Sequence, residues 1–416
     1  MKNSNPQKNN PKELVSAIIP TYNRCEFVQK AIDSALEQNY KNIEVIVIDD
    51  GSTDGSGAIL KERYGEKIQY FYQQNKGESF ARNFGVSVAK GDFLTFLDSD
   101  DVWFPTKLAK QMAILNNCPS VVAVYNNVVR IDENGNHIGG SSDGMHRKDL
   151  DFELETMIIR NRIPGGPSSC LIRREVYERL GGFSNDIQFG EDWELWLKII
   201  ANYPIFFVQE PLSAYRQHFH TQSAIPDIIQ VESRLKDYLK FLKRFANTYP
   251  DKVPKALLNK SLAYQYLTAS LASYYLGFAD KGKHCLAQAV EYDPTTWLSR
   301  KNLTHHIHMF VSGHFRNVDN KITANPIENF RVTIVNSLPE ALNKQRIKNS
   351  INGILKVHEG FSLNKQGWIK SGAKAVFVGL CYDPSLLNLS TLAVFSEPII
   401  GKEVVDRLRS LKHGAS

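Results

Sequence analysis

The 416-residue sequence contains no apolar stretch near the roughly 18–20 residues that a membrane-spanning helix needs. Residues 1–13, MKNSNPQKNNPKE, are polar and rich in Asn and Pro, and they lack the apolar core of a signal peptide. These two absences argue against an integral membrane protein and against a secreted one. We therefore expect a cytoplasmic protein whose residues 1–13 form a disordered leader.

Cysteine is scarce as well. The chain has five cysteines, and no two of them form a C-x-x-C pair. Closely spaced cysteine pairs are typical of zinc sites, and an even, regularly spaced set is typical of a disulfide framework. The sequence indicates neither, so we expect the five thiols to be packing residues in a reducing compartment.

Positive charge is in deficit in the first part of the chain and in excess in the second. Residues 1–225 carry 24 Lys and Arg against 29 Asp and Glu, whereas residues 226–416 carry 26 against 15. The basic part has two interpretations. It could consist of solvated helix faces, or it could attract an anionic lipid or protein partner at the membrane surface, an attraction that salt would weaken. No nucleic-acid partner is expected.

Residues 14–225 alternate between short β-branched runs and amphipathic helical stretches. This alternation predicts an α/β fold with an open, mostly parallel sheet. The first four strands are expected at residues 13–20, 43–51, 67–73 and 92–98. In such sheets ligands bind beyond the carboxyl ends of the strands. Polar residues gather at three of these ends, so we expect the functional site at that edge.

Residues 226–416 are expected to form an α-helical domain. Within it, the segments 277–294 and 367–384 share Gly, aromatic, Gly and Tyr-Asp-Pro positions at identical offsets. Each segment resembles the second half of a tetratricopeptide unit, in which a turn glycine precedes a helix that ends in Pro. The predicted order is therefore a leader, an α/β domain over 14–225 and a tetratricopeptide-like helical domain over 226–416.

Three aspartates follow the apolar run of residues 93–97: Asp98, Asp100 and Asp101. Carboxylates this close repel one another unless a positive species compensates them. A D-x-D pair at a strand end suits a hard divalent cation, Mn²⁺ or Mg²⁺, whose remaining ligands are phosphate oxygens. The alternative for the D-x-D alone is a solvated acidic loop.

Four segments then stand in a fixed order between residues 14 and 220: SAIIPTYNR, VIVIDDGSTDGS, NKGESFARNFGVSVAKGDFLTFLDSDD and GGFSNDIQFGEDWELWLKI. In these segments the sequence resembles the family 2 glycosyltransferases, enzymes of the GT-A fold. The resemblance implies a metal-dependent, inverting transfer of a sugar from a nucleotide-diphosphate donor, with a UDP-sugar expected first, to a hydroxyl acceptor. Cell-surface polysaccharide, lipid-linked oligosaccharide and protein all stay open as acceptors.

The same resemblance implies the residues of the site. It assigns the nucleotide to Pro20, Thr21, Tyr22, Arg24, Asp50, Arg82, Asp98 and Arg216. It assigns the metal to Asp100 and Asp98, with His218 as a further ligand. Asp101 is expected instead to cap a helix that starts near residue 105.

The reaction also needs a base, because an acceptor hydroxyl is a poor nucleophile until its proton is removed. The resemblance implies Asp192 as that base, with the neighbouring Glu191 as the alternative. A helix N-cap is the non-catalytic interpretation of this acidic pair. The segment NRIPGGPSSCLIRREVY, residues 161–177, is expected to form the wall on the acceptor side, where Gly165 and Gly166 allow a tight backbone path.

Two other functions are compatible with parts of the sequence. A nucleotidyltransferase on a related fold would show a glycine-rich loop near the first strand, and IIPTYNRCEF has none. A non-catalytic scaffold would use the helical part alone, but the intact Asp98, Asp100 and Asp192 argue against a decayed site. The chain also lacks the Q-x-x-R-W signature of processive, membrane-embedded synthases, which favours the addition of a single sugar.

Overall fold

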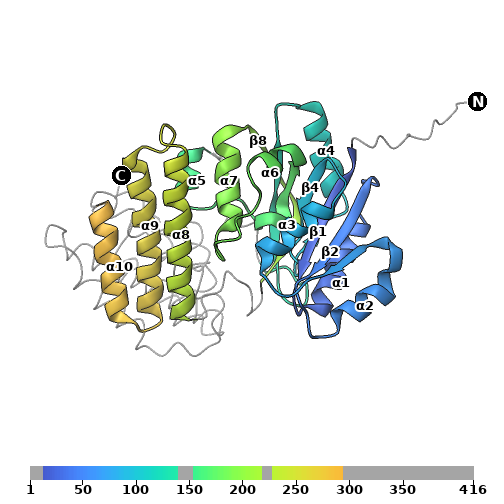
Figure 1. Cartoon of the computed structure of the whole chain (residues 1–416), viewed down its shortest axis with the longest axis horizontal. Helices are drawn as coiled ribbons and strands as arrows, with labels where there is room; N and C mark the ends of the chain where they lie inside the picture. Colours follow the sequence, from blue (N-terminus) through green and yellow to red (C-terminus); the bar gives the residue numbers. More distant parts are fainter. Residues whose placement is uncertain (1–12, 139–152, 218–226, 294–416) are drawn as a thin grey trace, which may run out of the picture. The chain divides into compact units, whose positions relative to one another are not determined.

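A computed structural model describes residues 13–138, 153–217 and 227–293 (Figure 1). These residues form two compact units. The first comprises the described residues up to 217 together with residues 236–254, and the second comprises residues 227–235 and 255–293. The first unit contains the sheet, and the second is helical. None of the helices in the described ranges is long and apolar enough to cross a membrane.

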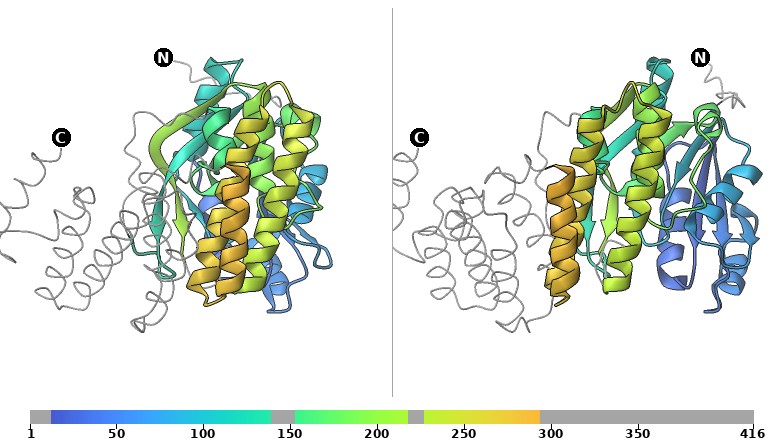
Figure 2. Two further views of the ribbon diagram at one scale, coloured as in Figure 1. Left: turned by 90° about the vertical axis from the view of Figure 1, so that its left-hand side faces the viewer. Right: turned by 60° about the vertical axis from the view of Figure 1, so that its left-hand side comes forward.

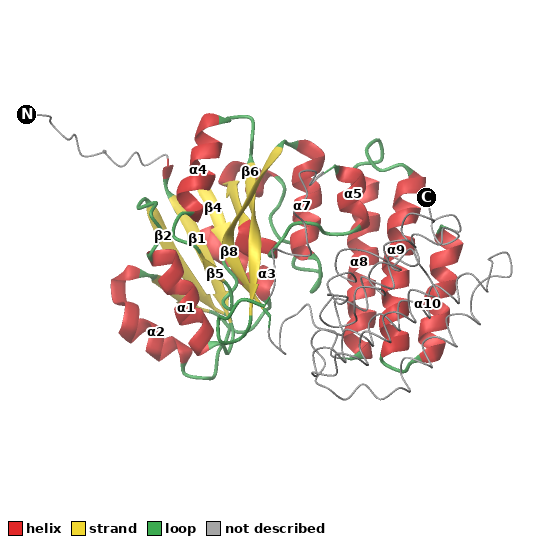
Figure 3. Ribbon diagram, turned by 180° about the vertical axis from the view of Figure 1, so that it is seen from behind, coloured by secondary structure: helices red, strands yellow, loops and turns green. Residues whose placement is uncertain are grey.

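Eight strands of the first unit form one sheet in the order β3-β2-β1-β4-β7-β6-β8-β5. Figure 3 shows the strands of this sheet in yellow. They are Val15–Thr21 (β1), Ile43–Asp49 (β2), Gln69–Tyr72 (β3), Phe93–Phe96 (β4), Val102–Trp103 (β5), Ala123–Ile131 (β6), Cys170–Arg173 (β7) and Ile205–Arg216 (β8). Strand β1 is parallel to β2 and β4, β2 is parallel to β3, and β6 is parallel to β8. Strand β7 is antiparallel to β4 and β6, and β5 to β8. The predicted mostly parallel α/β sheet is confirmed.

Helices connect the strands of the first unit. They are Cys25–Leu36 (α1), Ser56–Tyr64 (α2), Glu78–Val88 (α3), Lys107–Asn117 (α4), Leu154–Ile159 (α5), Arg174–Arg179 (α6) and Glu191–Asn202 (α7). The first strands are apolar without alternation because they are buried on both faces. Ile19 of β1 belongs to the core that contains Val28 of α1, whereas Ile48 of β2 packs with Ala81 of α3.

Hydrogen bonds join the loops that follow β1 and β2. The Asn23 side-chain oxygen accepts the Thr53 N–H at 2.7 Å, and the Asn23 N–H donates to Ser52 Oγ at 2.9 Å. Asn23 has a φ of 51°, a left-handed conformation that Asn tolerates better than most residues. The polar loops that were expected to share one edge of the sheet are therefore joined to each other.

Helix α8, Ile228–Thr248, begins in the second unit, but its residues from 236 onward belong to the first. The Asp237 carboxylate accepts the N–H groups of Gln188 and Phe189 at 2.8 and 3.1 Å. The rings of Tyr238 and Phe241 pack edge-on against Trp193 of α7, with centroids 5.5 and 5.1 Å away. This part of α8 therefore supports the segment in which α7 begins.

The described part of the second unit includes Lys255–Tyr275 (α9) and Ala279–Tyr292 (α10), which lie side by side (Figure 2). The Ser270 hydroxyl donates to the Gly282 carbonyl at 2.7 Å, and the Tyr266 and Tyr292 rings stack with centroids 5.6 Å apart. The first of the two similar segments thus contains a turn and a helix. The second, residues 367–384, lies outside the described residues, so the tetratricopeptide-like repeat stays a prediction.

Four of the five cysteines lie in the described residues. Cys25, Cys118, Cys170 and Cys285 are free thiols, and two of them are buried. The fifth cysteine, Cys381, lies outside the described ranges.

Candidate active site

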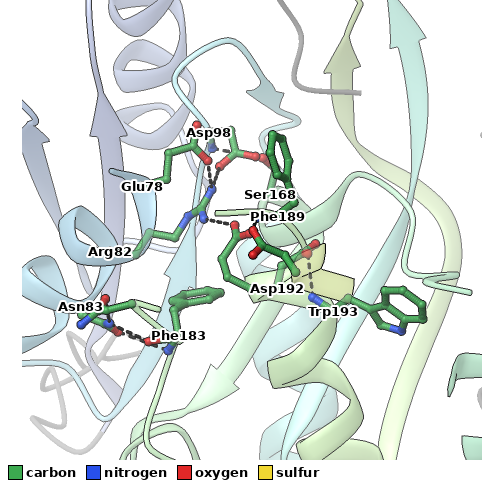
Figure 4. Close-up of polar contacts among 12 residues, drawn as sticks. Glu78, Arg82, Asn83, Asp98, Ser168, Phe183, Phe189, Asp192 and Trp193 are labelled. Carbon is green, nitrogen blue, oxygen red and sulfur yellow. Dashed lines mark hydrogen bonds and ion pairs between the residues drawn. The ribbon is translucent and has the colours of Figure 1, made fainter. Parts of the chain in front are cut away.

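Arg82 lies at the centre of the polar cluster at the carboxyl edge of the sheet (Figure 4). Its guanidinium is buried on α3 and donates through Nη1 to Glu191 Oε1 at 2.8 Å. Through Nη2 it donates to Asp98 Oδ1 at 2.7 Å and to Glu78 Oε2 at 3.0 Å. The Phe183 ring also lies near the guanidinium, with its centroid 5.2 Å from the guanidinium carbon. The Arg82 guanidinium therefore joins the D-x-D to the first turn of α7.

The base expected from the sequence is in that first turn. Gly190, with a φ of 81°, precedes α7, and Asp192 is its second residue. Asp192 Oδ1 accepts the Trp193 N–H at 2.6 Å, and Asp192 Oδ2 accepts a hydrogen bond from Asn161 Nδ2 at 3.3 Å. Asp192 is partly buried.

Burial raises the pKa of both carboxyl groups of the acidic pair. Burial raises the pKa of Asp192, and the positive charge of Arg82 opposes that rise. Burial also raises the pKa of Glu191, and the negative charge of Asp192 raises it further. A carboxylate with a raised pKa holds a proton more strongly, which is what a general base needs near neutral pH. Glu191 already pairs with Arg82, so Asp192 is the more available of the two.

The D-x-D carboxylates are both paired with arginines. Asp98 Oδ1 contacts Arg82, and Asp100 Oδ2 lies 2.8 Å from Arg24 Nη1. Their hard oxygen donors suit Mn²⁺ or Mg²⁺. Among the residues that the structure describes, no group of three or more His, Cys, Asp or Glu side chains could hold a metal ion. Two carboxylates therefore fit a cation only if phosphate oxygens and water complete its shell. His218 lies outside the described residues.

Five of the predicted nucleotide residues lie at the ends of β1 and β2 or just beyond them: Pro20, Thr21, Tyr22, Arg24 and Asp50. Pro20 and Thr21 are buried at the end of β1, and Tyr22 is 47% exposed beyond it. Thr21 Oγ1 is buried without a hydrogen-bond partner among the described residues. Arg24, whose side chain is 23% exposed, pairs with Asp100 as above. These residues do converge on the edge that carries the D-x-D.

Asp50 has several partners within the chain. Its Oδ1 accepts hydrogen bonds from Gln73 Nε2 at 2.6 Å and from the Lys76 N–H at 2.9 Å, and its Oδ2 accepts the Gly77 N–H at 2.8 Å. Asp50 therefore fixes the loop that leads into α3 and Arg82. Its predicted contact with the nucleotide base stays a prediction.

Asp101 does not cap a helix as the sequence suggested. Helix α4 begins at Lys107, and its N-cap residue Thr106 makes no side-chain cap hydrogen bond. Asp101 is buried, and its Oδ1 accepts the backbone N–H of Arg216 on β8 at 2.9 Å. The expectation was wrong because β8, more than a hundred residues away in sequence, supplies a closer backbone donor.

Arg216 is likewise bound within the chain. Its Nε donates to the Asp100 carbonyl at 2.7 Å, and its Nη1 donates to the carbonyls of Asp132 and Glu133 at 2.8 and 3.0 Å. The guanidinium also lies 5.1 Å from the Phe27 ring centroid. Arg216 thus supports the D-x-D backbone in this structure. Its predicted contact with the diphosphate stays a prediction.

Three residues near the site were not identified from the sequence. Glu78 pairs with Arg82, Asn161 contacts Asp192, and Ser168 Oγ accepts the Asp98 N–H at 3.1 Å. Glu78 and Arg82 are four residues apart in a predicted helix, a spacing that could have indicated their pairing. Asn161 and Ser168 belong to the segment expected to form the acceptor-side wall, but no residue spacing indicates their individual contacts.

Comparison with known proteins shows which protein family this chain resembles. The profile of "Glycosyl transferase family 2" matches residues 16–181. An uncharacterised glycosyltransferase of Rickettsia typhi is 34% identical over 243 residues, covering 57% of this chain and 75% of the relative. One of Rickettsia conorii is 35% identical over 209 residues, covering 49% of this chain but only 34% of the relative. This chain therefore spans about a third of that longer protein.

The solved structures include S. aureus TarS 1–349 in complex with UDP-GlcNAc. It matches with a TM-score of 0.46 and 18% identity, covering 89% of this chain and 92% of that one. The family rests on the profile match, which covers the D-x-D and ends before the acidic pair, and on the Rickettsia typhi relative, of which this chain covers 75%. The chain belongs to glycosyl transferase family 2 and is a glycosyltransferase.

Proposed function

We propose that this glycosyltransferase is metal-dependent and inverting, and that it moves a sugar from a nucleotide-diphosphate donor to a hydroxyl acceptor. The hydrogen bonds of Arg82 are the observation that carries this proposal. Through these bonds one guanidinium binds both Asp98, which is on the donor side, and Glu191, which is next to the proposed base Asp192. A donor bound at the D-x-D would therefore lie close to the base.

In the proposed reaction Asp192 accepts the proton of the acceptor hydroxyl. The acceptor oxygen then forms a bond to the anomeric carbon, and the bond from that carbon to the diphosphate oxygen breaks, with its electron pair leaving on the diphosphate. Because nucleophile and leaving group occupy opposite faces of the sugar, the configuration inverts. Burial raises the pKa of Asp192, which supports its role as the base.

Asp98 and Asp100 are the residues that would hold the metal. A bound Mn²⁺ or Mg²⁺ supplies positive charge that stabilises the leaving diphosphate. In this structure each of the two carboxylates forms an ion pair with an arginine, Asp98 with Arg82 and Asp100 with Arg24. Arg24 is partly exposed, so its guanidinium could also reach a phosphate.

The donor is proposed to be a UDP-sugar, with Thr21, Tyr22 and Asp50 on the nucleotide side. The buried and unpartnered Thr21 hydroxyl supports a ligand at this loop. The acceptor is a hydroxyl of a polysaccharide, a lipid-linked oligosaccharide or a protein. The basic part of the chain after residue 226 is proposed to bring the enzyme to an anionic lipid or protein partner on the cytoplasmic side.

A screen of donor hydrolysis tests the proposal. The full chain would be incubated with UDP-, GDP- and TDP-linked sugars in the presence of Mn²⁺ or Mg²⁺, and release of the nucleotide diphosphate would be measured. We expect release from one class of donor, loss of release with EDTA, and little release from Asp100→Ala.

Nucleotide binding provides the second measurement. The diphosphate of the hydrolysed donor should raise the melting temperature when Mn²⁺ is present and much less in EDTA. Asp100→Ala should lose that dependence on metal. A metal-dependent shift of the same size in Asp100→Ala would contradict the metal assignment, and no release from any donor would contradict the proposed transfer.

A further inference from the structure

The segment of residues 161–169, between α5 and β7, passes from the base to the D-x-D. Its last four residues, Gly166–Ser169, form a 3-10 helix. At this end, Ser168 Oγ accepts the Asp98 N–H, and the Ser168 carbonyl accepts a hydrogen bond from Trp103 Nε1 at 2.8 Å. The segment is therefore fixed to the strand end that carries the proposed metal ligands.

Close packing fixes the middle of the segment. Gly165 has a φ of 65°, and a Cβ built on it would lie 2.6 Å from Val128 Cγ1 on β6. Any side chain here would collide with the sheet. The backbone of residue 165 is therefore pressed against β6, and this contact sets the position of residue 166.

At its other end the segment holds the base. Asn161 Nδ2 donates to Asp192 Oδ2 at 3.3 Å. Asn161 Oδ1 accepts the Ile163 N–H at 3.1 Å, which sets the orientation of the amide. With its oxygen facing Ile163, the amide can present only its N–H₂ group to Asp192. Asn161 therefore orients the carboxylate and favours its ionised form.

Gly166 borders the remaining space beside that carboxylate oxygen. Its φ is 51°, and a Cβ built on it would lie 3.5 Å from Asp192 Oδ2. Among the described residues beyond its chain neighbours, no other heavy atom would lie within 4 Å of that Cβ. The absence of a side chain at residue 166 thus leaves Asp192 Oδ2 approachable from the side of the segment.

We infer that the 161–169 segment forms the acceptor side of the active site. Asn161 is a positioning residue for the base, and Gly166 leaves the opening through which the acceptor hydroxyl reaches Asp192 Oδ2. This inference rests on the proposed role of Asp192 as the base. The acceptor proton passes to Oδ2, while the acceptor oxygen bonds to the anomeric carbon and the diphosphate leaves with the electron pair of the broken bond.

Substitution of Asn161 separates positioning from a purely structural role. Asn161→Asp keeps an oxygen for the Ile163 N–H but loses the donor to Asp192 and adds a like charge. Asn161→Ala loses both contacts. With the nucleotide sugar that wild type hydrolyses, we expect kcat to fall roughly 10–100-fold in both variants, the effect of one hydrogen bond to a charged group. The Kd for the nucleotide diphosphate should stay within two-fold of wild type.

If Asn161→Asp hydrolyses the donor like wild type while Asn161→Ala does not, Asn161 only supports Ile163 and the positioning role is wrong. The same conclusion follows if both variants keep the wild-type kcat. Melting temperatures show whether each variant is folded, and the Asp variant, which is the same size as Asn, keeps the test available if Asn161→Ala is unstable.

Substitution of Gly166 tests the opening. Gly166→Asn places a side chain that tolerates left-handed backbone directly beside Asp192 Oδ2. Gly181→Asn is the matched control, because Gly181 has a φ of 81° and a Cβ there would meet nothing within 4 Å among the described residues. Two acceptors would be compared: water, through donor hydrolysis, and a panel of p-nitrophenyl glycosides, through formation of the glycosylated product.

For Gly166→Asn we expect transfer to the glycoside to fall at least ten-fold more than hydrolysis, because the added side chain obstructs a glycoside more than it obstructs water. If wild type uses only water, the opening is tested by hydrolysis alone, which should then fall more in Gly166→Asn than in Gly181→Asn. Equal effects of the two glycine variants would overturn the inference but not the proposed function. A wild type that hydrolyses no nucleotide sugar would overturn both.

Discussion

The guanidinium of Arg82 is almost entirely buried, and its partners come from three parts of the first unit. A buried charge is tolerated only when opposite charges and hydrogen bonds compensate it. Removing one member of such a group leaves the others buried without compensation, which costs more than the intact group contributes. Arg82 should therefore matter for folding as well as for the site.

Arg82→Met should lower the free energy of unfolding by about 3–5 kcal/mol, because Glu191 and Asp98 would lose their counterion. Urea denaturation of the full chain measures this change. Arg63→Met is the control. Arg63 pairs with Asp33 at 2.7 Å, but its side chain is 49% exposed, so we expect a loss below about 1 kcal/mol. Similar losses in the two variants would show that the buried cluster is not held by Arg82.

Asp192 and Glu191 should differ in what they do, although they are neighbours. Asp192→Asn keeps the shape of the side chain and removes the base, so transfer should fall roughly 10²–10⁴-fold. The affinity for the nucleotide diphosphate should change only a few-fold. Glu191→Gln should mainly weaken the contact with Arg82 and lower stability. Near wild-type transfer by Asp192→Asn, together with a large loss in Glu191→Gln, would identify Glu191 as the base.

Some of this residue-level detail could be predicted from the sequence and some could not. The D-x-D and the acidic pair stand in local motifs, so their candidates were found. The contact of Arg82 with Glu191 joins positions 109 residues apart, and only the folded sheet brings them together. The expected cap at Asp101 was wrong for the same reason, because its actual donor belongs to β8.

Helix α4 shows how one element combines packing with a buried charge. Lys107, its first residue, is fully buried. Its Nζ donates to Gln111 Oε1 at 2.9 Å and to Thr95 Oγ1 and the Cys170 carbonyl at 3.3 Å. It also lies 4.3 Å from the Trp103 ring centroid. No carboxylate is among these contacts, and burial lowers the pKa of Lys107 to about 7.

The lowered pKa makes stability depend on pH in a defined window. In the unfolded chain the ordinary pKa of 10.5 applies, so between about pH 7 and pH 10.5 the unfolded state binds a proton that the folded state lacks. The contribution of Lys107 to the free energy of unfolding therefore rises as pH rises through this window. Below it the folded state is protonated as well, and the full cost of burying the charge is present.

Lys107→Met should therefore stabilise the chain by about 1–2 kcal/mol near pH 7, and this gain should shrink as pH approaches 10. Urea denaturation of both proteins at several pH values measures the difference. Lys110→Met on the same helix is the control. Lys110 is exposed and pairs with Glu210, so its substitution should change neither the stability nor its pH dependence by more than a few tenths of a kcal/mol. A gain that does not vary with pH would contradict the lowered pKa of Lys107.

At the level of elements, the sequence was most informative where strands are buried on both faces. The short apolar runs of β1, β2 and β4 indicate strands because parallel strands that are buried on both faces have continuous apolar sequences. The two-residue strand β5 and the start of α4 at Lys107 have no comparable signal. The strand depends on its pairing with β8, and in the first turn of α4 the Leu108 N–H donates to Gln38 Oε1, contacts that only the tertiary structure supplies.

On the scale of the whole chain, residues 236–254 pack with the α/β part although they follow its last strand by about twenty residues. Arg244 binds Glu194 through two hydrogen bonds of 2.9 and 2.8 Å and also contacts Asp186 at 2.8 Å. Glu194 lies in α7 and is fully buried. The helix that carries the proposed base is therefore supported by a segment that the composition change near residue 226 assigns to the helical part.

Two truncations test where the catalytic unit ends. A chain ending at residue 254 keeps Asp237 and Arg244, so it should fold and should bind the nucleotide diphosphate as the full chain does. A chain ending at residue 225 leaves Glu194 without Arg244 and exposes Trp193. It should melt many degrees lower or fail to fold, since each kcal/mol lost shifts the melting temperature by about 2–4 °C in a domain of this size.

Arg244→Met in the full chain should also lower the melting temperature, by a smaller amount than the truncation at residue 225. Equal melting temperatures and equal nucleotide affinities for the two truncated chains would place the end of the catalytic unit before α8.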